Sequence, residues 1–376
     1  MAGLGVLGHP DSIDPPIPEG VQHRFVGLNS RTAKRALHGA HPVKGLYWWL
    51  QDSTPSTVFL AAHYNADFAE HYLAAPLAAR GYGFLGISTR FVTAEDRFDL
   101  DQALDDLAAA VEWIRKEVDP KSVVFIGNSG GGSLMAALNA AATAEPHLAA
   151  AAGDGFIFLN SHIGRADAFT NCLDPSVADE LDPVKTDSAL DAFNPENGPP
   201  FSQEFIERYH QAQKDRNQRI TDWSKAELKR LNELGIPDRL FLVFRSFADL
   251  RFLDHTIDPS TRKKGACIVG DPALANRSIP FFGRAMSLRG WLSMFSLEDS
   301  KARIEVSGPR FKTPTLILQG TDDVGVFPSD VRLIYDSIAS EDKEIVEVPG
   351  QHFFEDSQED VDRAADVISR WVSKRF

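Results

Sequence analysis

The sequence has few cysteines, no long apolar run and no excess of positive charge, and each absence excludes a class of protein. Two cysteines among 376 residues, Cys172 and Cys267, are too few for a disulfide framework or a cysteine zinc site. No stretch of about 18 uncharged apolar residues occurs, which argues against a membrane-spanning helix. The N-terminus lacks the basic start and apolar run of a secretory signal. We therefore expect a cytoplasmic protein.

The charge balance argues against two kinds of partner. The net charge is −14, from 39 basic and 53 acidic residues. A chain this acidic repels the phosphates of nucleic acid and of anionic membranes, so we expect neither as a partner. Apolar residues make up 43% and charged residues 24%, which are the proportions of an ordinary globular protein.

Strand-like and helix-like segments alternate along most of the chain, which predicts an α/β fold. The run 57–62 (TVFLAA) is wholly apolar, as expected of a strand covered on both faces. The segment 100–118 has apolar residues at alternating spacings of three and four, as in an amphipathic helix. This alternation predicts a doubly wound, mostly parallel, eight-stranded sheet. The eight expected strands are 22–26, 45–50, 57–62, 83–88, 122–126, 155–159, 314–318 and 345–348.

A second helix is expected between Asp67, as its N-cap, and Gly81. Pro76 lies inside this segment, and it should either kink the helix or shift its start, because proline cannot donate a backbone hydrogen bond.

The alternation is interrupted once, by about 150 residues that are too many for a structureless loop in a compact domain. The segment 202–235 is helical and heavily charged, and the charges of 204–230 are most simply explained as a solvated helix face. We predict an inserted helical cap over 163–309. The core would then comprise 1–162 and 310–376.

The sequence GNSGG at 127–131 directly follows the strand 122–126 and precedes a helix of small residues. This is the G-x-S-x-G pattern in a strand–turn–helix setting, where the serine is exposed on a sharp turn and can act as a nucleophile. We therefore predict that Ser129 is the nucleophile, with Ser133 as the next candidate. A plain glycine-rich turn remains an alternative. A phosphate-binding loop is disfavoured, because the lysine of a P-loop and the third glycine of G-x-G-x-x-G are missing.

Two further polar motifs follow the last two predicted strands. GTDD at 320–323 comes after the strand 314–318, and PGQH at 349–352 comes after the strand 345–348. Each is weak alone, since a loop aspartate is usually a turn residue and a single histidine is usually structural. A serine, an acid and a histidine in this order, each at a strand end, match the order of a hydrolytic triad.

On GNSGG, GTDD and PGQH the chain resembles the α/β-hydrolase superfamily, over roughly 22–160 and 310–376. The resemblance implies a serine hydrolase of esterase type with a large helical cap. It also implies that Ser129 is the nucleophile and His352 the general base. The family's H-G-x-x-D segment places the acid at Asp323, although Gln319 replaces its histidine, and Asp322 is the alternative.

The resemblance also implies an oxyanion hole built from two backbone N–H groups. One belongs to Gly130, the residue after the nucleophile. The other comes from the loop after the strand 57–62, which reads AHYNAD where the family often has His-Gly. We favour Tyr64 as this second donor, with Asn65 next, and we expect His63 to hold the loop structurally.

Other residues are weaker candidates. His162 follows the strand 155–159 and is a candidate pocket residue, although a structural hinge role explains it more simply. Arg90 is expected to anchor an active-site loop through a salt bridge. The candidate substrate-binding residues are Asn65, His162, Phe282 and Trp291. No HExxH, His-x-His or carboxylate cluster occurs, so we expect no metal and no cofactor.

The predicted function is hydrolysis of a small carboxylic ester through an acyl-enzyme, with water as the co-substrate. Large apolar side chains in the cap favour compact, apolar substrates, with an aromatic, phthalate-type ester as one option. The same triad could cleave an amide, a lactone or a carbon–carbon bond in a diketone. A non-catalytic binding protein on a hydrolase fold is the alternative from another class, and a homodimer is left open.

Overall fold

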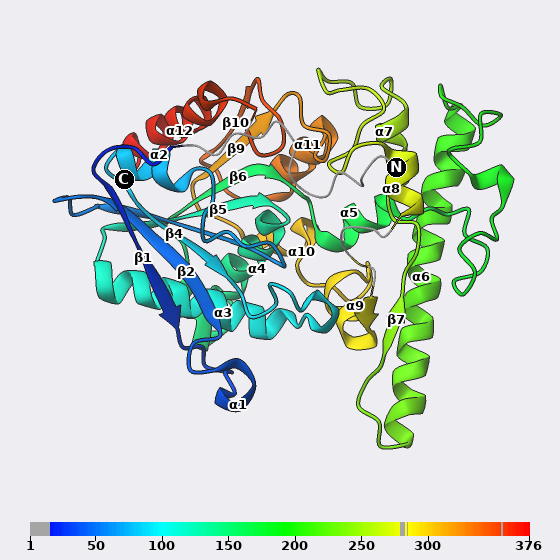
Figure 1. Cartoon of the computed structure of the whole chain (residues 1–376), viewed down its shortest axis with the longest axis horizontal. Coiled ribbons are helices and arrows are strands. Elements are labelled where there is room, and N and C mark those ends of the chain that lie inside the picture. Colours follow the sequence, from blue (N-terminus) through cyan, green and yellow to red (C-terminus); the bar gives the residue numbers. More distant parts are fainter. Residues whose placement is uncertain (1–15, 279–282, 284, 355) are drawn as a thin grey trace. The chain divides into compact units, whose positions relative to one another are not determined.

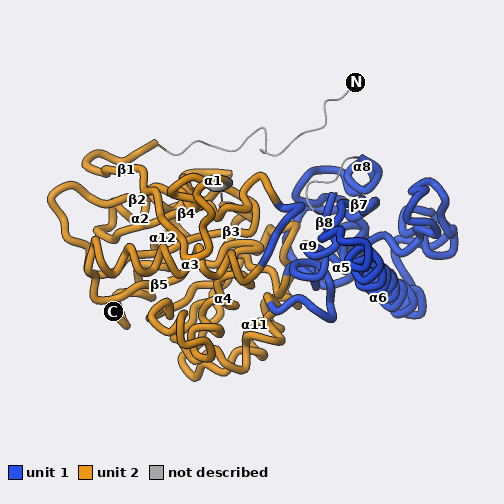
Figure 2. Tube along the Cα trace, turned by 90° about the horizontal axis from the view of Figure 1, so that it is seen from below, with its two compact units in different colours: residues 1–10, 95–99, 165–301 blue, residues 11–94, 100–164, 302–376 orange. Residues whose placement is uncertain are grey.

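The computed structural model describes residues 16–278, 283, 285–354 and 356–376, which fall into two compact units (Figure 2). Among the described residues, unit 1 contains 95–99 and 165–301, and unit 2 contains 16–94, 100–164 and 302–376. The predicted cap began at 163 and ended at 309. Unit 1 ends at 301, earlier than the predicted cap, because the backbone after this residue pairs with unit 2. Ile304 N donates to Ile163 O at 2.7 Å, and Gly164 forms a bridge with Arg303.

Unit 2 is built around an eight-stranded sheet with the strand order β1-β2-β4-β3-β5-β6-β9-β10 (Figure 1). The pairs β1–β2 and β2–β4 are antiparallel, and all other neighbours are parallel. This confirms the predicted mostly parallel, eight-stranded α/β sheet. The strands are β1 (Val21–Leu28), β2 (Val43–Leu50), β3 (Thr57–His63), β4 (Gly83–Ser88), β5 (Ser122–Ser129), β6 (Gly155–Ser161), β9 (Thr315–Gly320) and β10 (Lys343–Val348).

Helices cover both faces of this sheet. On β3, Phe59 and Ala61 belong to a buried cluster formed with α2 and α12, while Val58 and Leu60 point to the other face, as strand geometry requires. The helices α3 and α4 lie against β3. The whole of β3 is therefore buried, as its apolar sequence predicted. The helices of unit 2 are α1 (Arg35–His38), α2 (Ala74–Ala79), α3 (Leu100–Trp113), α4 (Gly131–Ala141), α10 (Ile304–Ser307), α11 (Pro328–Ser337) and α12 (Gln358–Ser373).

The helix predicted with Asp67 as its N-cap begins six residues later than expected, at Ala74, with Leu73 as its N-cap. Asp67 does not cap it. Its Oδ1 instead accepts from Ala69 N at 2.9 Å, which closes a local turn, and from the hydroxyl of Ser88, which ties this turn to the end of β4. Pro76 therefore lies in the first turn of α2, where a missing N–H does no harm. By contrast, the predicted segment 100–118 is helical throughout, because α3 continues into a single π-helical turn at Ile114–Val118.

Unit 1 is mainly helical, and its longest element is α6 (Gln203–Glu233). Ser202 caps this helix, since its side chain accepts from Phe205 N at 3.2 Å. The predicted helix over 202–235 is thus confirmed, but one of its charges is not solvated: Arg216 is fully buried. The remaining elements are α5 (Arg165–Cys172), α7 (Leu250–Leu253), α8 (Pro272–Arg277), α9 (Leu288–Met294), β7 (Leu240–Leu242) and β8 (Ala285–Ser287).

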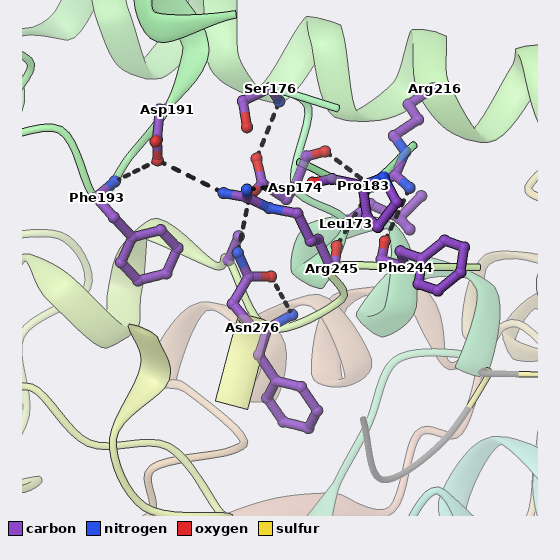
Figure 3. Close-up of polar contacts among 12 residues, drawn as sticks. Leu173, Asp174, Ser176, Pro183, Asp191, Phe193, Arg216, Phe244, Arg245 and Asn276 are labelled. Carbon is purple, nitrogen blue, oxygen red and sulfur yellow. Dashed lines mark hydrogen bonds and ion pairs between the residues drawn. The ribbon is translucent and has the colours of Figure 1, made fainter. Parts of the chain in front are cut away.

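A buried ionic cluster fastens the irregular segments of unit 1 to α6 (Figure 3). The carboxylate of Asp174 accepts from Arg245 Nε and from Asn276 Nδ2, both at 2.7 Å. Arg216 donates to the backbone oxygen of Asp174 at 2.8 Å and to the Glu180 carboxylate at 2.7 and 2.8 Å. Buried charges persist only when they are paired in this way, so the cluster explains why Arg216 is tolerated in the interior of unit 1.

No helix in the described ranges of either unit is both long enough and apolar enough to cross a lipid bilayer.

Candidate active site

Ser129 is the last residue of β5 and lies on the sharp turn into α4. Its φ is 53°, in the left-handed region that few non-glycine residues adopt. Two glycines let the turn pack closely: a Cβ on Gly127 would lie 2.5 Å from the Cα of Gly132, and a Cβ on Gly131 would lie 2.2 Å from Ala62 O. Neither position has room for a side chain. The backbone strain at Ser129 is of the kind that concentrates at functional sites.

His352 and Asp323 form a buried pair after β10 and β9. His352 Nδ1 lies 2.8 Å from Asp323 Oδ2 and 3.0 Å from Oδ1. The same carboxylate also accepts from Gly325 N at 2.7 Å and Val326 N at 3.1 Å, which fixes its orientation. Because Nδ1 faces a carboxylate, it carries the proton in the neutral imidazole, and Nε2 is left as the acceptor. His352 Nε2 is buried and has no hydrogen-bond partner among the described residues.

Asp322, the alternative acid, has a different role in the loop. Its Oδ2 accepts from Gly350 N at 3.0 Å, and its own N–H donates to Gly350 O at 3.0 Å. Asp322 thus joins the loops after β9 and β10 through the backbone of Gly350. Of the two neighbouring carboxylates, Asp323 is the one that contacts the imidazole.

The loop after β3 lies against the nucleophile turn. Asn65 N and Ala66 N donate to His63 Nδ1 at 3.4 and 3.1 Å, so His63 holds this loop as expected. The Asn65 N–H is thus engaged with His63, and the choice of Tyr64 as the second oxyanion donor stays a prediction. The Tyr64 side chain is fully buried, and its hydroxyl lies 3.0 Å from Ser133 Oγ on α4. The contact between the Tyr64 and Ser133 hydroxyl groups therefore joins the loop after β3 to the start of α4. These two segments carry the predicted donors, Tyr64 N–H and Gly130 N–H.

Arg90 anchors the loop after β4, as predicted. Its guanidinium donates to Asp106 on α3, with Nε lying 3.0 and 3.1 Å from the two carboxylate oxygens. It also donates to Ser30 Oγ at 2.8 Å and to Thr32 Oγ1 at 3.1 Å. Arg90 and Asp106 are both almost fully buried, so the pair is a structural clamp with saturated hydrogen bonding.

Comparison with known proteins gives likeness in structure only. No protein-family model matches the chain, and no curated protein matches its sequence. Among solved structures, the alpha/beta hydrolase GrgF from Penicillium sp. sh18 aligns with a TM-score of 0.53 at 16% identity, over 94% of this chain and 99% of that chain. A soluble variant of monoglyceride lipase from Saccharomyces cerevisiae aligns with a TM-score of 0.51 at 15% identity, over 98% of this chain and all (100%) of that chain. The hypothetical protein PA2218 from Pseudomonas aeruginosa aligns with a TM-score of 0.51 at 16% identity, over 97% of this chain and 98% of that chain.

The chain has the α/β-hydrolase fold. Two observations support this: the order of the strands, with its two antiparallel pairs at the β1 edge, and the alignment with known hydrolase structures over almost the whole chain. The expectation drawn from the three motifs is therefore confirmed for the fold.

On the α/β-hydrolase fold of unit 2, His162 lies beside the predicted triad. Its ring centroid is 5.9 Å from that of His352, and its backbone N–H donates to Ser129 O at 3.0 Å. The side chain is half-buried. Its proposed contact with substrate stays a prediction.

Of the two candidate substrate-binding residues in the insertion, only Trp291 lies among the described residues. Trp291 is fully buried within unit 1, where its Nε1 donates to Thr221 Oγ1 at 3.0 Å. Its ring packs against Phe169, Phe241 and Phe295, with centroids about 6 Å apart as in other aromatic pairs. These contacts account for the burial of Trp291 without a substrate. Phe282 lies outside the described residues.

Two buried residues beside the α/β-hydrolase motifs were missed by the sequence analysis. His71 contacts Asn128, the neighbour of Ser129, and Asn160 contacts the loops of Asp323 and His352. The only sequence signal was that Asn160 follows the strand 155–159. Within the described residues, no group of three His, Cys, Asp or Glu side chains could hold a metal ion.

Proposed function

We propose that this protein is a serine hydrolase that cleaves carboxylic esters through an acyl-enzyme. The observation that carries the proposal is the His352–Asp323 pair, in which Asp323 holds Nδ1 and the buried Nε2 is left without a partner. Ser129, on its strained turn, supplies a hydroxyl group at the end of β5, which pairs with the other edge of β6 from β9. The three residues also occur in the order typical of this fold.

The proposed reaction has two halves. In the first, His352 Nε2 takes the proton of Ser129 Oγ while the oxygen attacks the ester carbonyl, and the N–H groups of Gly130 and Tyr64 stabilise the resulting oxyanion. The imidazolium then protonates the departing alcohol, which leaves an acyl group on Ser129. In the second half, Nε2 takes a proton from water, the hydroxide attacks the acyl group, and Ser129 recovers its proton as the acid departs. Asp323 keeps the imidazole in the required tautomer throughout and stabilises its charged form.

The proposed substrates are compact, apolar esters, with aromatic esters of phthalate type among them. The support is the sequence of the inserted segment, which is rich in phenylalanine. Ligand sites are mostly apolar with a few polar groups, and a few such side chains suffice to line one.

The test is a pair of measurements on the purified protein. A fluorophosphonate probe should label a single serine, identified by peptide mass spectrometry as Ser129. p-Nitrophenyl acetate should give a burst of p-nitrophenol of about one equivalent per labelled site if deacylation is the slower half, as is common for such acyl-enzymes. An absence of both labelling and turnover across short esters, aromatic diesters, lactones and amides would favour the binding protein on a hydrolase fold instead.

A further inference from the structure

Asn160 is fully buried near the end of β6, and it interrupts the pairing of that strand with β5. The register runs from Asn128 opposite Leu159 to Ser129 opposite Ser161, so Asn160 is an extra residue with no partner on β5. Its φ is 40°, in the left-handed region that asparagine tolerates better than most residues. This is a β-bulge beside the nucleophile, and bulges re-aim a side chain out of the regular alternation of a strand.

The carboxamide of Asn160 reaches the end of β9, just before the predicted acid, and the loop after β10 that carries the predicted base. Its Oδ1 accepts from Gly320 N at 2.6 Å, and its Nδ2 donates to His352 O at 2.8 Å and Gln351 O at 3.0 Å. Gly320 is the last residue of β9, three positions before Asp323. One planar group thus sets the backbone of the acid loop and of the histidine loop relative to β6.

These two loops approach each other closely at the same place. A Cβ on Gly320 would lie 2.4 Å from Gly350 O, so the backbones are in direct contact. β6 itself is tied to the nucleophile, because His162 N donates to Ser129 O at 3.0 Å. Asn160 therefore lies where the segments carrying Ser129, Asp323 and His352 meet.

We propose that Asn160 is a positioning residue for the triad, which holds the backbone of His352 so that its imidazole is aimed from Asp323 towards Ser129. The inference rests on the proposed serine hydrolase function. Its physical basis is that proton transfer and nucleophilic attack require the reacting groups within a narrow geometry, and a displacement of about 1 Å can cost on the order of 100-fold in rate. A residue that only fastened loops would affect folding stability and leave the chemistry of the folded molecules unchanged.

The chain offers a matched control at the opposite end of the same strands. Asn139 on α4 is also buried, and its Oδ1 accepts from Gly153 N at 3.0 Å while its Nδ2 donates to Thr313 Oγ1 at 2.6 Å. Gly153 precedes β6 and Thr313 precedes β9. Asn139 thus joins the beginnings of β6 and β9 with one carboxamide, at the opposite end of these strands from the triad. Asn160 likewise joins β6 to the end of β9 and to the loop after β10.

The experiment compares Asn160→Gly, Asn160→Asp and Asn139→Ala with the wild type. Glycine removes the amide and is compatible with the left-handed φ, whereas aspartate keeps the shape and the acceptor for Gly320 N and loses both donated bonds. Alanine suits the helical position of Asn139. Each kcat is divided by the number of sites that a fluorophosphonate titrates to completion, so that unfolded molecules are not counted. Urea unfolding gives the stability of each variant.

We expect both Asn160 variants to lose about 10- to 100-fold in kcat per titrated site, with KM changed less than threefold, because misplacement affects the chemical step more than binding. Asn139→Ala should lose stability and keep its kcat per site. Equal kcat per site in the Asn160 variants and the wild type would overturn the proposal, as would failure of both Asn160 variants to fold. A wild type that neither hydrolyses esters nor takes the fluorophosphonate would instead overturn the proposed function and this inference with it.

Discussion

His71 and Asn128 are joined side chain to side chain in the interior of unit 2, with His71 Nε2 lying 3.1 Å from Asn128 Oδ1. Leu73 N donates to His71 Nδ1 at 3.2 Å, so the proton of the neutral ring is on Nε2. Asn128 in turn donates to Leu159 O at 2.9 Å. Asn128, the residue before Ser129, is thus hydrogen-bonded both to the loop after β3 and to β6.

This arrangement predicts that His71 makes the fold sensitive to acid. Burial lowers the pKa of His71 from 6.5 to about 3, against the opposing effect of the hydrogen bond to Asn128. The folded protein keeps the ring neutral, whereas the unfolded chain binds a proton below about pH 6.5. The stability contributed by the neutral ring is therefore fully present above this pH, and it is lost progressively as the pH falls towards 3.

The test is urea unfolding of the wild type and His71→Gln at several pH values between 7 and 4. The wild type should lose up to about 1.4 kcal/mol per pH unit more than the variant over this range, which is the linkage expected for one proton. His71→Gln should be less stable than the wild type at pH 7, because it loses the ring packing. Parallel pH dependences in the two proteins would show that His71 titrates alike in the folded and unfolded chain.

Ser129→Ala should reduce ester turnover by something on the order of 10⁶, as loss of the nucleophile does in other serine triads. Ser133→Ala is the matched control. Ser133 is fully buried, and its hydroxyl is bonded to Tyr64 and to Gly130 O. We expect this control to keep fluorophosphonate labelling, which Ser129→Ala should abolish. Labelling retained in Ser129→Ala and lost in Ser133→Ala would move the nucleophile to Ser133.

Asp323→Asn should reduce kcat by roughly 10⁴, because the introduced carboxamide favours the wrong imidazole tautomer. Gly325 N and Val326 N donate to Oδ1, so the amide oxygen would stay there and the NH2 group would face His352 Nδ1. Asp322→Asn should have a much smaller effect, since an amide oxygen can still accept from Gly350 N. The test is to measure kcat of the two variants by steady-state kinetics. Equal losses of kcat would contradict the assignment of Asp323 as the acid of the triad.

Trp291→Ala should destabilise unit 1 by about 3–5 kcal/mol, the usual cost of removing a large buried aromatic side chain. The variant leaves Thr221 without its indole donor and opens a cavity among three aromatic rings. Urea unfolding measures the loss, and relative rates on acetate, butyrate and benzoate esters test the earlier prediction of a substrate contact. A changed ester ranking with no loss of stability would place Trp291 at a pocket rather than in the interior of unit 1.

Several features could be predicted from the sequence because they depend on neighbouring residues. Apolar runs bounded by turns indicated the five central strands β3, β4, β5, β6 and β9, since these strands are buried throughout and their burial is recorded in their own residues. The turn at Ser129 was evident from glycines that lie within a few positions of it. The regular spacing of apolar residues likewise predicted the helix over 100–118.

Other features were decided only by the tertiary structure, because they depend on groups far apart in the chain. Nothing near Asp322 or Asp323 shows which carboxylate contacts His352, since the choice depends on how the loop after β9 faces the loop after β10. The start of α2 was misplaced because Asp67 hydrogen-bonds to Ser88 rather than capping a helix. Asn160 was overlooked for the same reason: its three hydrogen bonds join segments about 160 to 190 residues away, a separation that no local pattern records.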